Sequence, residues 1–215
     1  MSVKERLSLL YFEIQKTALK VGRDPSVVTV IAIGKYASLD QIKEAYAAGI
    51  RHFGESRLQA FLAKKDLLPK DIIWHFIGPI QSNKAAAITE AFSYIHSISS
   101  IKVAKIVSET SLRLRKKTPC FLQINVSLDP LKQGFTQEEF KTLKEELSSL
   151  EGLSIQGLMT IGPYVTEENS LRECFQKLYS LQGNYPYLSM GMSGDFMVAI
   201  EEGSTHIRIG SYLFS

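Results

Sequence analysis

Apolar residues at the start of the chain recur at the spacing of an amphipathic helix. Val3, Leu7 and Leu10 fall on one face, and the periodicity predicts a helix that ends at Gly22. The pattern then changes to the run VVTVIAIG at residues 27–34, which is typical of a strand buried on both faces. A helix followed by a fully buried strand is a pattern of α/β proteins.

Strand-like and helix-like segments then alternate to the end of the chain. Ser38 and Gln41 have the spacing of a capping box, as do Thr136 and Glu139, so each pair predicts the start of a helix. Ser82 is expected to cap another helix. Further strands are expected at residues 51–54, 71–77, 94–97, 119–126, 154–161, 187–190 and 205–209. The helices between them are expected to end near residues 49 and 66, to begin at 82, and to span 100–116, 136–150, 167–182 and 193–202.

Eight buried strands separated by helices predict the fold class. In roughly 200 residues this alternation is the pattern of a (β/α)₈ TIM barrel, and an open doubly wound sheet is the alternative. We expect one domain over residues 1–215, in which residues 1–24 form an additional N-terminal helix that packs on the barrel. Whatever chemistry the chain carries should then lie at the carboxyl ends of the strands.

Composition and charge narrow the classes of function. The 25 Lys and Arg against 22 Asp and Glu leave a net charge of only +3, spread too evenly for a nucleic-acid interface. No apolar stretch predicts a signal peptide or a membrane helix, so we expect a cytoplasmic protein. Cys120 and Cys174 lack the spacing of a disulfide framework or a zinc site and are predicted to be core residues.

Lys35 is the first candidate for chemistry. It directly follows the buried strand that ends in IAIG, so its amine is predicted to lie near the mouth of the barrel. Partial desolvation there lowers the pKa of an amine, and a lysine tuned in this way forms Schiff bases. A solvated loop lysine is the competing interpretation.

The last two strand ends carry a second candidate site. Ser193 and Asp195 are predicted to begin a helix after the seventh strand, and Gly210 and Ser211 follow the eighth. Barrels commonly build a phosphate site from these two loops, although Ser193 as a simple helix cap is an equal alternative. Arg208 is predicted to face the barrel mouth, where it would bind a phosphate, donate to a pyridine nitrogen or pair with a carboxylate.

The four histidines give no metal site. His75 lies inside a strand and is predicted to be a satisfied core residue rather than a catalyst. The others show no metal-ligand spacing, and the sequence has no GxGxxG or P-loop pattern.

Several segments together resemble one known family. VTVIAIGK, AGIRHFGES, WHFIG with QSNK, IHSISS, QGLMTIGP, LSMGMSGDF and GSTHIRIGS are similar, in this order, to the YggS/PROSC family of pyridoxal-phosphate homeostasis proteins. The resemblance implies that Lys35 holds pyridoxal 5′-phosphate covalently as a Schiff base. It also implies that Ser193, Gly210, Ser211 and Arg208 hold the phosphate or the ring of the cofactor.

The chain departs from the family pattern at two positions and at its end. Ser56 stands where the family usually has the asparagine of a GEN segment, and Pro79 replaces the usual histidine before QSNK. The C-terminus is shorter than usual. This should leave the site intact, because Gly210 and Ser211 are present, but it predicts a less well anchored phosphate loop.

The resemblance also implies the kind of activity. We expect a monomeric carrier of vitamin B6 in its phosphate form that passes the cofactor to pyridoxal-phosphate-dependent apoenzymes and has no turnover of its own. An amino-acid racemase of the alanine racemase type and a cofactor-free Schiff-base aldolase are the alternatives. The racemase adds a second domain for which 215 residues leave no room, and racemisation needs an acid–base group on each face of the cofactor.

Overall fold

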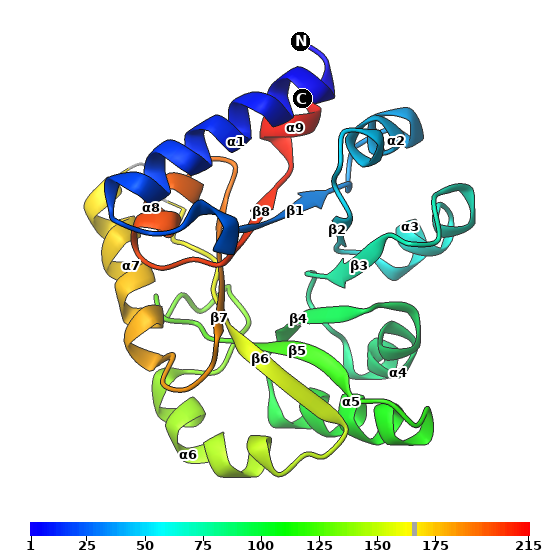
Figure 1. Cartoon of the computed structure of the whole chain (residues 1–215). Helices are drawn as coiled ribbons and strands as arrows, with labels where there is room; N and C mark the ends of the chain where they lie inside the picture. Colours follow the sequence, from blue (N-terminus) through cyan, green and yellow to red (C-terminus); the bar gives the residue numbers. More distant parts are fainter. Residues whose placement is uncertain (165–166) are drawn as a thin grey trace.

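The computed structural model describes residues 1–164 and 167–215 and shows a closed barrel of eight parallel strands in sequence order (Figure 1). Strand β1 pairs with β2 on one side and with β8 on the other, where Thr29 lies opposite His206. The barrel predicted from the alternation is therefore confirmed, and the open sheet is excluded. The strands are β1 (Thr29–Ile33), β2 (His52–Glu55), β3 (Ile73–Phe76), β4 (Tyr94–Ile98), β5 (Thr118–Gln123), β6 (Leu153–Met159), β7 (Tyr187–Met192) and β8 (His206–Ile209).

Helices follow the strands and cover the outside of the barrel (Figure 1). The α-helices are α1 (Val3–Lys20), α2 (Leu39–Ala47), α3 (Leu58–Leu62), α4 (Ser82–Ala91), α5 (Ile101–Arg113), α6 (Gln137–Ser148), α7 (Glu168–Leu181), α8 (Phe196–Glu201) and α9 (Ser211–Phe214). Two 3₁₀-helices, η1 (Pro25–Val27) and η2 (Lys65–Leu67), lie in connections. No helix in the described ranges is both long and apolar enough to cross a membrane.

The two predicted capping boxes form, and they start α2 and α6. In each, the Ser38 or Thr136 hydroxyl accepts the third backbone N–H of the helix, and the Gln41 or Glu139 side chain accepts the cap N–H. The N-terminal helix also forms as predicted. It packs against α2, α8 and α9.

Several predicted bounds are wrong. The strand expected at 119–126 ends at Gln123, and the helix expected at 100–116 ends at Arg113. The first strand begins at Thr29 rather than 27, because Asp24 accepts the Ser26 N–H and Pro25 starts a 3₁₀ turn. The helix expected to run to residue 66 ends at Leu62. Ser82 is the first residue of α4 and not its cap, a position that Gln81 occupies without a side-chain bond. The helix expected from 193 starts only at Phe196.

The barrel interior is unusually polar. Barrels of this type fill their interior mainly with branched apolar side chains, whereas here His75, His96, Ser189, His206 and Arg208 are buried. Contacts between strands that are not neighbours, such as His96 of β4 with Ser189 of β7, place these side chains inside the barrel. Most of the remaining apolar core lies between the strands and the outer helices.

Candidate functional site

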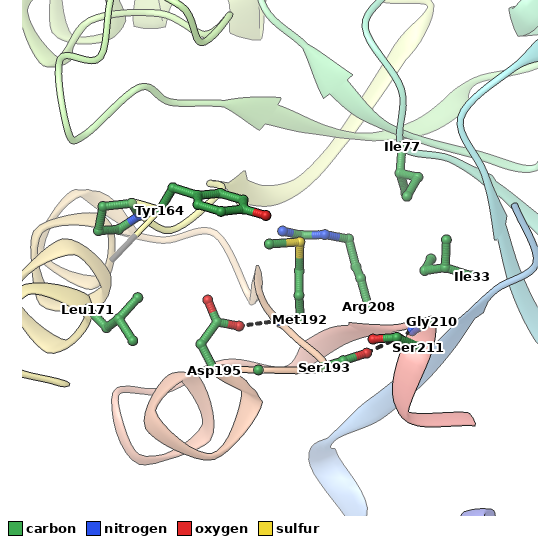
Figure 2. A pocket seen from close by; sticks show the side chains of 12 residues that line it. Ile33, Ile77, Tyr164, Leu171, Met192, Ser193, Asp195, Arg208, Gly210 and Ser211 are labelled. Atoms are coloured by element: carbon green, nitrogen blue, oxygen red, sulfur yellow. Dashed lines mark hydrogen bonds between the residues drawn. The ribbon is translucent and has the colours of Figure 1, made fainter. Parts of the chain in front are cut away.

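A cavity of about 720 Å³ opens at the carboxyl ends of the strands, between the loops after β6, β7 and β8 (Figure 2). Its volume is in the range usual for small-molecule sites. It is lined by Ile33, Ile77, Pro163, Tyr164, Leu171, Met192, Ser193, Gly194, Asp195, Arg208, Gly210 and Ser211. Four of the five residues predicted to form the site are thus brought together, and the exception is Lys35.

Ser193 joins the loop after β7 to the end of the chain. Its Oγ accepts the backbone N–H of Gly210 at 3.1 Å and that of Tyr212 at 3.2 Å. Ser193 therefore does not cap its own helix, as one alternative held, but caps the short helix α9. This contact also anchors the loop after β8, which was expected to be less well anchored. Gln41 supports the same segment by donating to the Phe214 carbonyl.

Arg208 brings a buried positive charge to the floor of the cavity (Figure 2). Its side chain is held by the Ser189 carbonyl and hydroxyl, at 2.8 and 2.9 Å, and by the Thr160 carbonyl at 2.9 Å. Burial lowers the pKa of the guanidinium to about 10, and Asp195 opposes this shift, so Arg208 stays charged at neutral pH. A guanidinium has five N–H groups, and at least two remain for a ligand.

Asp195 supplies a carboxylate on the opposite wall. Its Oδ1 accepts the Met192 N–H. Burial raises the pKa of the Asp195 carboxyl group above its ordinary value, and the Met192 N–H and Arg208 partly oppose this shift. An added Cβ at Gly162 would lie 2.9 Å from Oδ2, so glycine at that position lets the carboxylate pack against the backbone. The sequence marked Asp195 only as a helix-start residue.

Lys35 lies at the rim and not among the residues that line the cavity. The side chain is exposed, and its Nζ lies 4.8 Å from the centroid of the Tyr36 ring. The predicted desolvation is therefore wrong for this conformation, because the loop directs the amine outward. Ile33, two residues earlier, does line the cavity, and an added Cβ at Gly210 would lie 3.6 Å from its carbonyl.

A buried ion pair supports the loop that carries Lys35. Lys64 Nζ lies 2.6 Å from Glu55 Oε2 and donates to the Gly34 carbonyl at 2.9 Å. The second oxygen of Glu55 accepts the Ser56 N–H at 2.8 Å. Ser56, the departure from the family pattern, thus has its backbone fixed whatever its side chain does.

His75 and the two cysteines lie in the core. His75 is almost fully buried and hydrogen-bonded on both ring nitrogens, which confirms that it is a core residue. Cys120 and Cys174 are free and buried, as predicted. Sequence reasoning missed Tyr164 and Ile77 at the cavity, and their positions just after β6 and β3 were the available signal.

The cavity combines an apolar wall with donors for an anion. Ile33, Ile77 and Met192 supply apolar surface, while the Ser193 and Ser211 hydroxyls and the Arg208 guanidinium supply donors. Such a set suits a small molecule that has an apolar part and a negative group.

Comparison with known proteins identifies close relatives. Residues 13–215 match the family described as alanine racemase, N-terminal domain. The chain is 37% identical to the pyridoxal phosphate homeostasis protein of Pseudomonas aeruginosa, over 99% of this chain and 95% of the relative. It is 40% identical to the protein of the same name from Synechocystis, over 88% and 92% of the two chains.

Solved structures of similar proteins cover the whole chain or nearly all of it. PipY of Synechococcus elongatus is 35% identical and covers 100% of both chains, with a TM-score of 0.87 without pyridoxal phosphate and 0.85 with it bound. Alanine racemase of Bartonella henselae has a TM-score of 0.72 at 15% identity, and the match covers 99% of this chain but only 59% of the racemase. The latter likeness shows a shared barrel and nothing more.

Proposed function

The chain belongs to the family of the pyridoxal phosphate homeostasis proteins, and from this membership we propose that it binds pyridoxal 5′-phosphate in the cavity at the carboxyl ends of the strands. In this role it takes part in intracellular vitamin B6 homeostasis. The relatives are named for homeostasis rather than for a reaction, which supports a carrier over an enzyme.

One observation carries the assignment of the cavity. Arg208 is a buried cation with unused N–H groups, and it lines the same cavity as Gly210 and the hydroxyls of Ser193 and Ser211. A doubly charged phosphate ester with an aromatic ring matches both this donor set and the apolar wall. We assign Ser193, Gly210, Ser211 and Arg208 to the phosphate or the ring.

Lys35 is assigned as the point of covalent attachment. The loop after β1 adjoins the loop after β8, because Ala32 pairs with Ile209 in the sheet. Rotation of the exposed Lys35 side chain away from Tyr36 is the movement that this assignment requires. When bound, the cofactor supplies an aldehyde that condenses reversibly with an amine.

The proposal includes no turnover, because proton transfer on both faces of the cofactor needs a second positioned acid–base group. It also includes a cytoplasmic monomer that delivers the cofactor to apoenzymes which depend on it. An amino-acid racemase and a cofactor-free Schiff-base aldolase remain the alternatives that an experiment has to separate.

The test is the visible absorption spectrum of the purified protein with pyridoxal phosphate, followed by borohydride reduction and mass mapping. We expect a yellow band and a modified peptide that contains Lys35. Lys35→Ala should abolish the covalent attachment, whereas Lys84→Ala, at an exposed lysine of α4, should leave it unchanged. Ser193→Ala should weaken retention by roughly 1 kcal/mol, the net worth of one hydrogen bond.

Three results would contradict the proposal. A colourless wild-type protein would favour the cofactor-free aldolase. Undiminished attachment in Lys35→Ala would move the site to another lysine. Exchange of the α-proton of alanine in deuterated water, catalysed by the loaded protein, would favour the racemase.

A further inference from the structure

Hydrogen bonds connect three histidines in a row that crosses the barrel interior. His52 Nδ1 lies 2.9 Å from His75 Nε2, and His75 Nδ1 lies 2.8 Å from His96 Nε2. His96 Nδ1 lies 2.9 Å from the hydroxyl of Ser189, which accepts from Arg208 at 2.9 Å. This histidine row begins at half-buried His52, the first residue of β2, and ends at the guanidinium on the cavity floor.

Arg208 fixes the direction of donation along the row. A guanidinium only donates, so the Ser189 oxygen accepts at that end and its hydroxyl hydrogen must find another acceptor. Among the described residues the acceptor within reach is His96 Nδ1. A neutral histidine with an accepting Nδ1 carries its proton on Nε2, and the same pattern then repeats at His75 and His52.

The opposite direction leaves one group unsatisfied. If His52, His75 and His96 were all protonated on Nδ1, the Ser189 oxygen would accept twice and its hydroxyl hydrogen would point at no acceptor in the described part of the chain. Burying an unsatisfied donor is costly. The uniform direction with protonated Nε2 atoms gives every hydrogen bond from His52 to Arg208 one donor and one acceptor.

The surroundings keep the rings neutral and in place. Burial lowers the pKa of His75 and that of His96 well below the ordinary value, and the neighbouring histidines add to the shift. His75 stacks on Tyr94 at a centroid distance of 4.7 Å, and His96 stacks on Phe121 at 4.2 Å. The rings therefore have little freedom to turn.

We propose that Ser189, His96 and His75 are positioning residues for Arg208, joined to His52 in one row whose histidines all carry the proton on Nε2. The row holds the Ser189 hydroxyl with its lone pairs toward Arg208 and so aims the remaining guanidinium N–H groups into the cavity. The role of Arg208 toward pyridoxal phosphate rests on the function proposed above, whereas the direction of the row does not.

The direction is tested on the wild-type protein without cofactor. Long-range ¹H–¹⁵N correlation spectra of ¹⁵N-labelled protein at pH 7.5 distinguish protonated from unprotonated imidazole nitrogens. We expect His52, His75 and His96 to be neutral with the proton on Nε2. A proton on Nδ1 of His75 or His96 would overturn the proposal without any variant having to fold.

The positioning role is tested with Ser189→Ala and a matched control. Ser204→Ala removes another fully buried serine hydroxyl, one that donates to the Met190 carbonyl and lies outside the row. We expect Ser189→Ala to bind pyridoxal phosphate about three- to tenfold more weakly, because Arg208 loses the hydroxyl that accepts from it. The ¹⁵N resonance of His96 Nδ1 should also shift, because this nitrogen loses its donor. Ser204→Ala should keep the wild-type affinity and the wild-type proton positions.

The outcomes separate the two proposals. Equal affinities in Ser189→Ala and Ser204→Ala, in a wild-type protein that binds the cofactor, would overturn the positioning role alone. Absence of binding in the wild type would overturn the proposed function and the cofactor half of this inference, and the NMR spectra would still decide the direction of the row.

Discussion

Glu55 is a fully buried carboxylate at the end of β2 and forms an ion pair with one lysine. Lys64 Nζ lies 2.6 Å from it and also holds the Gly34 carbonyl, directly before Lys35. Removing one partner of a buried pair leaves the other charge uncompensated. Lys64 therefore contributes both to the stability of the protein and to the shape of the loop that carries Lys35.

Lys64→Met should lower the free energy of unfolding by about 3–5 kcal/mol, measured by urea denaturation. Lys65→Met, at the exposed neighbouring lysine, is the control and should change it by less than about 0.5 kcal/mol. The double variant Lys64→Met/Glu55→Gln should recover part of the loss because no buried charge remains. A loss in Lys64→Met no larger than in the control would show that Glu55 is held by its backbone contacts alone.

Single residues also show what the sequence could and could not reveal. Gly210, Ser211 and Arg208 were located at the cavity because strand parity and the order of loops in a barrel place them there. The outward direction of the Lys35 side chain depends on the path of one loop, which the pattern of apolar and polar residues does not predict. The link from His96 to Ser189 joins residues 93 positions apart, so only the closed barrel reveals it.

Among the helices, α7 and α8 are joined by a charged cluster centred on Arg172. Its guanidinium donates to Glu168 within α7, to Glu201 of α8 and to Glu202, which directly follows α8. Glu201 also accepts from Lys20 of α1 at 2.7 Å. The N-terminal helix is thus tied into the same cluster.

Arg172→Met should reduce stability by about 1–2 kcal/mol at pH 7, more than an isolated surface pair contributes. Lys20 and Arg172 lower the pKa of Glu201 below its ordinary value of 4.5. The stabilisation is therefore complete above pH 4.5 and is lost as the pH falls through the lower folded value. Thermal or urea unfolding of the wild type and of Arg172→Met should be measured from pH 7 to 3. The difference between their free energies of unfolding should shrink below pH 4.5.

Arg113→Met is the control, because Arg113 makes one exposed pair with Glu90 and should contribute less than about 0.5 kcal/mol. A difference between wild type and Arg172→Met that stays constant down to pH 3 would mean that packing of the arginine stem, rather than charge, accounts for the effect.

The starts of helices were predicted from the sequence in some cases and not in others. The capping boxes at Ser38 and Thr136 were predicted because two side chains at fixed spacing identify them. The caps expected at Ser82 and Ser193 failed, because a lone serine supplies a hydroxyl but no indication of where the backbone begins to coil. At Ser193 the hydroxyl is used by Gly210 and Tyr212 instead.

The architecture of the whole molecule was predictable because it depends on the number and order of the strand-like and helix-like segments. Eight apolar runs separated by amphipathic segments admit few arrangements, and errors of two residues at strand ends do not alter them. The short helix α9 was not predicted, since four residues carry too little periodicity. It is nevertheless packed into the fold, because Leu213 is fully buried and α9 contacts α1.

Leu213→Ala should destabilise the protein by about 2–5 kcal/mol through the cavity it leaves, measured by chemical denaturation. It should also weaken retention of pyridoxal phosphate, because α9 positions Ser211. Leu131→Ala, at a leucine that is 93% exposed, is the matched control and should change neither property. Destabilisation with unchanged retention would separate the anchoring of α9 from the candidate site.

The pairing of β1 with β8 also sets the order of events during synthesis. Thr29 is synthesised long before His206, its partner in the sheet. Until His206 is made, the barrel has two open edges whose unpaired N–H and C=O groups invite strands of other chains. Contacts this distant in sequence form slowly. A nascent chain that stalls before residue 206 is therefore the form most exposed to aggregation and most in need of a chaperone.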